Sequence, residues 1–142
     1  MMPSFSRKSR AILDTVHPDL QKVFEAVVGG FDCTPLCGIR TAEEQAALYA
    51  IGRTTNIGQR RVTTLDGYKK KSRHQSGEAI DIVPYPIDWS DLHRFYFFAG
   101  YVKRTAEGFG IELRWGGDWD GDTDVSKADN GFMDLLHWEL KR

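Results

Sequence analysis

Apolar residues recur at helical spacing in three stretches of the chain. The first begins near Pro18, which fits the first turn of a helix, and ends in two glycines. In the second, Thr41 and Glu44 form a capping box at the start. The third carries an apolar stripe, with Asp88 or Ser90 as its N-cap. The pattern predicts helices over residues 17–30, 41–52 and 88–108.

Short apolar runs predict the strands. Residues 78–83 alternate cleanly, so that Asp81 shares one face with small apolar residues and two isoleucines share the other. Further runs predict strands over residues 111–115 and 135–140, and a strand or loop over 31–40. Because these elements mix without a regular βαβ rhythm, we expect an α+β fold, with a small antiparallel sheet and flanking helices. Residues 53–72 are polar and basic, which predicts a long loop of functional or mobile character.

Length and charge restrict the function. The chain has 142 residues, and we expect a single catalytic domain over residues 1–142. A net charge of −1 argues against a general nucleic-acid binder. No apolar stretch approaches the ~20 residues of a membrane span, and no apolar run follows the basic N-terminus, so we expect no membrane insertion, no secretory signal and a cytoplasmic location. Cys33 and Cys37 are interpreted as small core residues, with a partial metal site as the alternative.

The final strand carries the first sign of chemistry. Alternation directs Leu136, Trp138 and Leu140 to the core, so that His137 points to a cleft. Asp134 precedes this strand, and a turn there brings its carboxylate to the same cleft.

A second polar group lies upstream, where His74 precedes a strand and Asp81 lies within it. A histidine taken alone is usually structural, but a carboxylate in an apolar strand is costly unless it is paired or binds a metal. Three ligands, His74, Asp81 and His137, leave a fourth zinc position open, as catalysis requires. Asp134 is then the candidate for proton transfer.

The motifs Ser72-x-His74-x-x-Gly77-x-Ala79-x-Asp81 and Asp134-x-x-His137-Trp138-Glu139 resemble those of the zinc D-Ala-D-Ala carboxypeptidase and dipeptidase family. The resemblance is greatest to phage endolysins that are L-alanyl-D-glutamate peptidases. It extends to Gly38–Leu48 and Arg114–Trp119, and so covers nearly the whole chain. It implies a hedgehog/DD-peptidase-like fold and a monomer that acts on bacterial peptidoglycan after a holin opens the membrane.

The resemblance also implies roles for single residues. The zinc ligands fall on His74, Asp81 and His137, and the acid/base carboxylate falls on Asp134, where many relatives have Glu and the endolysin branch also uses Asp. Arg40 falls at the position that contacts substrate or stabilises the oxyanion; a structural salt bridge is its alternative.

Ser72 and Arg73 are candidate substrate-binding residues, and the run Lys69-Lys70-Lys71 attracts anionic wall peptides or is a solvated loop. Two other functions stay open: a D-Ala-D-Ala carboxypeptidase, and a non-catalytic wall-binding domain of the same fold.

An acidic stretch raises a separate question. Asp118-x-Asp120-x-Asp122-x-Asp124 resembles the start of an EF-hand loop, with Asp129 at the twelfth position. Thr123 stands where such loops have Gly, and the last ligand is Asp rather than Glu. The stretch is either a calcium site, with its first three aspartates as ligands, or an acidic solvated turn.

Overall fold

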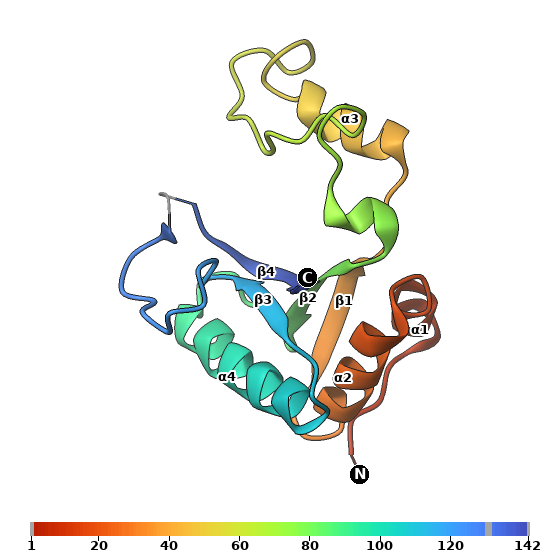
Figure 1. The fold of residues 1–142 in the computed structure, drawn as a ribbon, viewed down its shortest axis with the longest axis vertical. Helices are drawn as coiled ribbons and strands as arrows, with labels where there is room; N and C mark the ends of the chain where they lie inside the picture. Colours follow the sequence, from red (N-terminus) through yellow and green to blue (C-terminus); the bar gives the residue numbers. More distant parts are fainter. Residues whose placement is uncertain (1, 130–131, 142) are drawn as a thin grey trace.

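The fold is built on one four-stranded antiparallel sheet. The computed structural model describes residues 2–129 and 132–141. The strands run in the order β1-β2-β4-β3, and every neighbouring pair is antiparallel (Figure 1). Their bounds are β1 Cys33–Cys37, β2 Ala79–Pro84, β3 Leu113–Gly116 and β4 Asp134–Leu140. The predicted α+β class with a small antiparallel sheet is confirmed.

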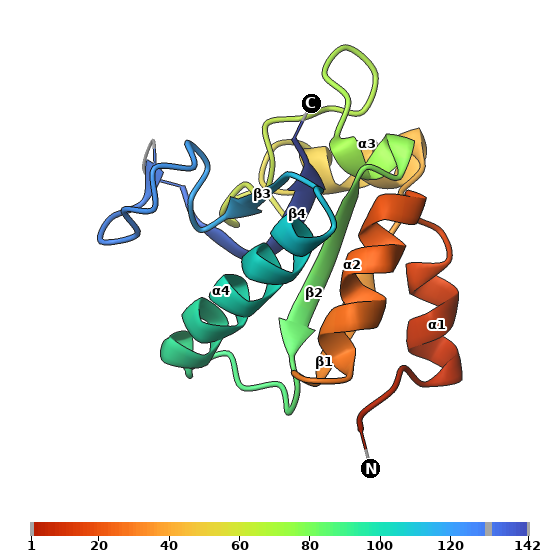
Figure 2. The same ribbon diagram turned by 60° about the horizontal axis from the view of Figure 1, so that its bottom comes forward.

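Helices cover one face of the sheet. In Figure 2, α2 and α4 lie along that face and α1 lies beside α2. The helices are α1 Arg7–Leu13, α2 Pro18–Val28, α3 Ala42–Ala50 and α4 Leu92–Gly108, with a 3-10 turn η1 at Arg73–Ser76. Among the described residues, no helix is long and apolar enough to cross a membrane.

The core lies between this helical layer and the sheet. Trp138 is fully buried at its centre, where it stacks on Trp115 and meets the edge of Phe24. Ile80 and Ile82 of β2 also belong to the core. Since successive strand residues alternate in direction, the odd-numbered neighbours of Ile80 and Trp138 point to the sheet's other face.

The structure corrects three local predictions. Helix α1 was not predicted, because its seven residues are mostly polar. Helix α4 is capped by Asp91, whose side chain accepts a hydrogen bond from Arg94 N, and not by Asp88 or Ser90. Leu135 rather than Leu136 packs against the core, because a β-bulge shifts the register between β3 and β4.

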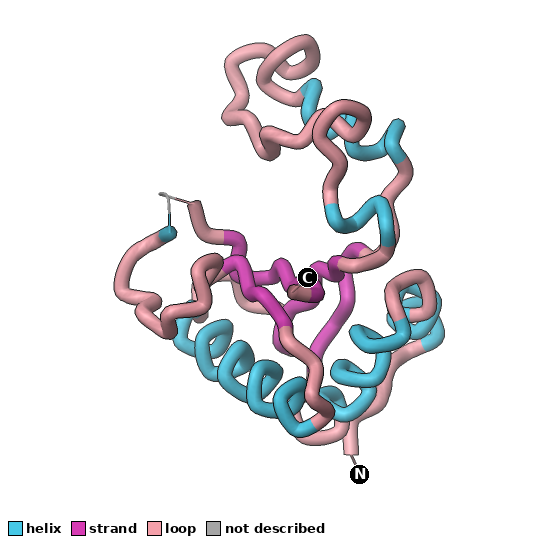
Figure 3. Tube along the Cα trace, viewed as in Figure 1, coloured by secondary structure: helices cyan, strands magenta, loops and turns pink. Residues whose placement is uncertain are grey.

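Two segments project from this body. Helix α3 and the long loop that follows it form a lobe away from the sheet, and a second long loop joins β3 to β4 (Figures 1 and 3). The predicted loop over residues 53–72 is confirmed, since it contains neither helix nor strand.

Candidate metal centre and active site

Asp81 and His137 face each other across two neighbouring strands. In the antiparallel ladder, Asp81 of β2 is the direct register partner of His137 of β4. Directly paired residues point to the same face. Because Ile80 and Trp138 lie in the core, this carboxylate and this imidazole occupy the face that the helices leave open.

His74 reaches the same point from the turn before β2. Ser72 caps η1, and its Oγ accepts a hydrogen bond from His74 N at 3.2 Å. The Gln75 side chain accepts from Ser72 N at 2.8 Å and completes a capping box. Gly77 ends the turn with φ +76°, a conformation that favours glycine. The spacing from His74 to Asp81 therefore spans one closed turn and the entry to a strand.

The three side chains have the separations of metal ligands. Asp81 Oδ1 lies 3.2 Å from His74 Nε2 and 3.3 Å from His137 Nδ1. Two ligand atoms on a tetrahedral zinc are about 3.3 Å apart, given bonds of ~2.0–2.1 Å. Asp81 Oδ1 is buried and forms no hydrogen bond with any described residue. The donor set, and this buried oxygen without a hydrogen bond, fit a zinc ion.

The far nitrogens of both rings are already engaged. His74 Nδ1 lies 2.9 Å from the Gly38 carbonyl oxygen, and His137 Nε2 lies 2.9 Å from Glu139 Oε1. When these nitrogens donate, the near nitrogens of the neutral rings carry lone pairs toward Asp81. Such backing of a ring by a carbonyl or carboxylate is typical of metal-binding histidines.

Without a metal ion, protons on the two histidines balance the negative charge of Asp81. Burial alone would lower the pKa of His74, but the contact with Asp81 outweighs it and raises that pKa to about 9. Burial would raise the pKa of Asp81, yet the two histidines lower it to about 2. The pKa of His137 is raised against burial by Asp81 and Glu139. The site therefore favours cations between its carboxylates.

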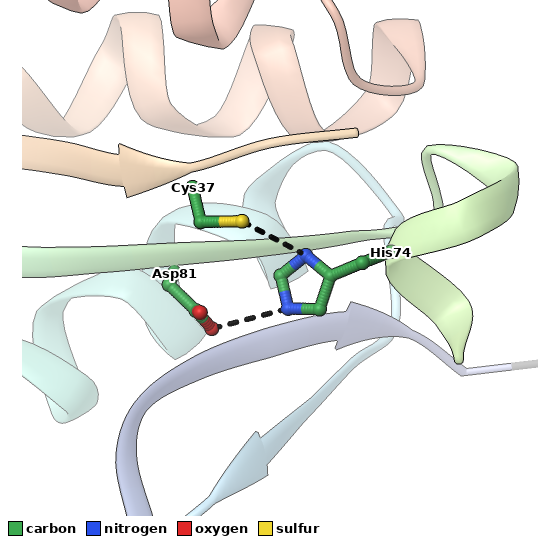
Figure 4. Close-up of side chains that lie close together, drawn as sticks. All are labelled: Cys37, His74 and Asp81. Carbon is green, nitrogen blue, oxygen red and sulfur yellow. Dashed lines mark hydrogen bonds and ion pairs between the residues drawn. The ribbon is translucent and has the colours of Figure 1, made fainter. Parts of the chain in front are cut away.

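Cys37 lies beside the candidate metal centre, but not on the side of the His74 ring that faces Asp81 (Figure 4). Two clusters of candidate ligands share Asp81: one with Cys37 and His74, one with Asp134 and His137. Figure 4 shows that Cys37 and Asp81 approach different nitrogens of His74. The Cys37 thiol lies 4.0 Å from Nδ1, the nitrogen that is hydrogen-bonded to the Gly38 carbonyl oxygen. A metal ion on Nε2 would therefore be bound without this thiol.

Asp134 stands at the start of β4, next to the candidate ligands. Its register partner across the bulge is Gly116, where an added Cβ would clash with the Asp134 carbonyl oxygen. Its carboxylate lies within 4.8 Å of ligand atoms of Asp81 and His137. Burial, and then the charge of Asp81, raise the pKa of Asp134 above its usual value. A carboxylate of this kind suits proton transfer.

Arg40 contacts the second carboxylate oxygen of Asp81. Its Nη2 lies 3.8 Å from Asp81 Oδ2, and its Nη1 donates to Gln45 Oε1 at 2.7 Å. Gln45 is only 1% exposed, although it is polar. Sequence reasoning assigned Gln45 no role, because its contact with Arg40 becomes visible only when α3 is placed.

The two candidate substrate residues have other contacts. The Ser72 hydroxyl is used in capping η1. Arg73 lies 3.7 Å from Glu139 and 3.8 Å from Glu78, and donates to the Leu140 carbonyl oxygen. The structure therefore brings Arg73 to the back of the His137 ring.

Glu139 is a further residue that sequence reasoning assigned no role. It is buried and lies between His137, Arg73 and Arg114, whose Nη1 is 3.5 Å from its Oε2. Burial would raise its pKa, but the hydrogen bond with His137 and the two arginines hold that pKa below its usual value. The two-residue spacing from His137 is the signal that could have identified it, since such residues share a strand face.

The acidic loop comes close to the metal centre through Trp119, whose ring centroid is 5.4 Å from that of His137. Within the loop, Asp118 and Asp120 cluster with Asp129. Asp122 is outside that cluster, and its carboxylate accepts a hydrogen bond from Asp124 N.

Known proteins resemble this chain over nearly its full length. It is 34% identical over 142 residues to an L-alanyl-D-glutamate peptidase of Escherichia phage T5, with 96% of both chains covered. The structure of a Serratia marcescens L-Ala D-Glu endopeptidase, ChiX, matches with a TM-score of 0.68 and 25% identity, over 96% of this chain and 89% of that one.

A more distant likeness concerns the fold alone. A vancomycin resistance D,D-pentapeptidase, solved with Zn(II), matches with a TM-score of 0.52 and 19% identity, over 87% of this chain and 68% of that one. The family model for phage L-alanyl-D-glutamate peptidases matches residues 1–141. The chain therefore belongs to the phage L-alanyl-D-glutamate peptidase family.

Proposed function

We propose that this chain hydrolyses an amide bond in the stem peptide of bacterial peptidoglycan, namely the bond between L-alanine and D-glutamate. The observation that carries the proposal is the convergence of His74, Asp81 and His137 on one point, with Asp134 beside it. Family membership supports the choice of substrate.

The residues divide the work of hydrolysis. His74, Asp81 and His137 would hold a zinc ion, which supplies Lewis acidity for the scissile carbonyl and for the attacking water. Asp134 accepts a proton from that water as its oxygen bonds to the carbonyl carbon. Asp134 then delivers a proton to the amine nitrogen as the C–N bond breaks. The guanidinium of Arg40 donates to the oxyanion that develops on the substrate.

Metal dependence and product identity test this proposal together. Chelation should abolish release of peptides from purified sacculi, and zinc readdition should restore it. Mass spectrometry should find new N-terminal D-glutamate. Unchanged lysis after chelation, with no zinc found by metal analysis, would overturn the proposal.

Two alternatives make different products. A D-Ala-D-Ala carboxypeptidase would release free D-alanine, and the fold-level match to a D,D-pentapeptidase is its support. A wall-binding domain without activity would release nothing; the half-buried carboxylate of Asp134 beside the candidate ligands argues against it.

We also propose the setting in which the enzyme works. It acts as a monomeric single domain over residues 1–142, is made in the host cytoplasm, and reaches the wall after a holin permeabilises the membrane. Gel filtration tests the first part, and lysis of intact cells with and without a permeabilising agent tests the second.

For the acidic loop we propose a calcium ion held by Asp118 and Asp120. Asp118 Oδ1 is buried without a hydrogen-bond partner in the described residues. Thr123 adopts φ +70°, the conformation for which EF-hand loops use glycine. Calorimetric titration with CaCl₂ should detect one site that Asp118→Ala removes; no heat at millimolar calcium would refute it.

A further inference from the structure

The charge of the chain is unevenly distributed. We name residues 52–71 the basic loop. It contains six cations and a single carboxylate, so its net charge is +5, whereas the rest of the chain sums to −6. The six cations are Arg53, Arg60, Arg61, Lys69, Lys70 and Lys71.

Five of these cations are free to bind a partner. All except Arg53, which packs over Tyr49, are exposed. Within residues 2–129 and 132–141, none of the five has a carboxylate within 4.0 Å. By contrast, Arg73 just beyond the loop pairs with two carboxylates. Unpaired cations in one loop create a local positive potential that ordinary surface ion pairs would cancel.

The one carboxylate of the loop is directed inward. Asp66 Oδ1 accepts hydrogen bonds from the backbone N–H groups of Tyr68, Lys69 and Lys70, at 3.1, 2.9 and 2.8 Å. These bonds lower the pKa of Asp66. The negative charge therefore shapes the lysine turn instead of pairing with the lysine side chains.

Buried and half-buried glutamines fasten the loop to the active site. Gln45, which also binds Arg40, donates to the Leu65 carbonyl oxygen at 2.8 Å. Gln75, in the turn that carries His74, donates to the Gly67 carbonyl oxygen at 2.8 Å. Figure 1 shows the resulting lobe, in which the loop returns directly into η1. The stretch of the loop around Leu65 and Gly67 is thus attached to the segments that carry Arg40 and His74.

Exposed apolar side chains lie among the cations. Ile57 is 80% exposed, Tyr68 59% and Val62 48%. A surface that mixes unpaired cations with apolar groups fits a polymer that presents carboxylates on a backbone of sugars and methyl-bearing residues. The stem peptides of peptidoglycan have this chemistry, with free carboxylates on D-glutamate and on the residues beyond it.

We propose that the basic loop is a polymer-binding surface that holds the carboxylates of peptidoglycan peptides neighbouring the one being cleaved. The inference rests on the proposed function and extends it from the scissile bond to the surrounding wall. Its physical basis is that a fixed positive surface raises the local concentration of an anionic polymer and is weakened by salt.

The test compares an insoluble and a short substrate. In the combined Arg60→Gln, Arg61→Gln, Lys70→Gln and Lys71→Gln variant, binding to sacculi should weaken about tenfold at low salt. The difference should shrink toward none above about 0.5 M salt, where screening acts within a few ångströms. Turnover on sacculi should fall at least five times more than turnover on a soluble L-alanyl-D-glutamyl peptide.

A matched pair of cations supplies the control. Arg7 and Lys8 of α1 are exposed and, in the described part of the chain, also lack a carboxylate within 4.0 Å. The Arg7→Gln/Lys8→Gln variant should bind sacculi as the wild type does, whereas the two-charge variants Arg60→Gln/Arg61→Gln and Lys70→Gln/Lys71→Gln should each bind more weakly.

Treated walls identify the ligand. The wild type should bind sacculi with amidated carboxylates as weakly as the four-charge variant binds untreated sacculi. Removal of phosphate polymers by acid should change the binding of the wild type little. Dependence on the phosphate polymers, equal losses on both substrates, or an equal effect of the α1 variant would each overturn the inference. If the wild type cleaves neither substrate, the proposed function fails instead.

Discussion

The two sides of the active site are held in place in different ways. On the sheet side, Asp81 and His137 are fixed by the backbone ladder between β2 and β4. On the loop side, His74 and Arg40 come from a short turn and from the segment after β1, outside that ladder. The backbone therefore positions the ligands on the sheet side, whereas the positions of His74 and Arg40 on the loop side depend on a few polar contacts.

Those polar contacts form one connected series across the loop side. Arg40 N donates to the His74 carbonyl oxygen at 2.9 Å, the Arg40 side chain donates to Gln45, and Gln45 reaches the basic loop. Changes on the loop side should therefore affect substrate handling and stability together. On the sheet side, a substitution at Asp134 should affect the chemical step, and a substitution at Glu139 should affect metal affinity.

The largest expected effect is on the sheet side. Asp134→Asn should lower kcat by about 10²–10⁴-fold, because an amide cannot transfer the proton. Zinc content should stay at the wild-type level. Since burial and Asp81 raise the pKa of Asp134, and the carboxylate must be ionised to act, wild-type activity should be lost as pH falls through a value above 3.8.

Metal analysis and a pH profile of kcat/KM check this prediction. A near-normal rate in Asp134→Asn, or loss of zinc from it, would remove Asp134 from the role of proton carrier.

The second effect concerns the support behind His137. Glu139→Gln should weaken zinc binding by about 10–100-fold, as expected when a carboxylate that backs a metal-binding histidine loses its charge. Competition with a chromophoric chelator measures the affinity. Glu107→Gln is the control, because Glu107 pairs with Arg104 at 3.6 Å on an exposed helix face. Equal zinc affinities in both variants would show that Glu139 supports the fold alone.

The sheet side was also the side that the sequence predicted better. Alternation in the last strand directed His137 away from the core, and alternation in residues 78–83 put Asp81 on the face opposite Ile80 and Ile82. The ladder pairs Asp81 and His137 directly. Glu139 could have followed from the same alternation. The β-bulge could not, because it depends on the close approach of Gly116 to Asp134 across two strands.

On the loop side, the role of Arg40 was predicted only through the resemblance. Spacing placed His74 near Asp81, but the contacts of Cys37 and Gln45 depend on where β1 and α3 lie relative to η1. Those contacts join residues 37 and 20 positions apart, such as Cys37 with His74 and Gln45 with Leu65. Local propensity carries no information about such pairs. The loop itself was predicted from its composition, while its attachment to the site was not.

The third effect tests the series of polar contacts on the loop side. Gln45→Ala should lower kcat/KM about tenfold and stability by ~1–3 kcal/mol, because Arg40 and the Leu65 carbonyl lose a buried partner. Zinc affinity should change little. Gln45→Glu keeps an acceptor for Arg40 but removes the donor to Leu65, so it should recover turnover more than stability. If Gln45→Glu recovers neither, or if zinc is lost, the division between the two sides does not hold.

The smallest effect concerns the cap before His74. Ser72→Ala removes the acceptor for His74 N and should cost about 1 kcal/mol of stability, the usual value of an N-cap. Ser6 caps α1 through an equivalent bond of 3.2 Å to Ser9 N, so Ser6→Ala should cost a similar amount. Only Ser72→Ala should also weaken zinc binding a few-fold, because η1 is not part of the ladder and its cap helps to orient the His74 ring. Thermal unfolding and zinc competition on both variants measure the difference. Equal zinc affinities would mean that the contact between His74 Nδ1 and the Gly38 carbonyl alone orients the ring, and that the loop side is as well fixed as the sheet side.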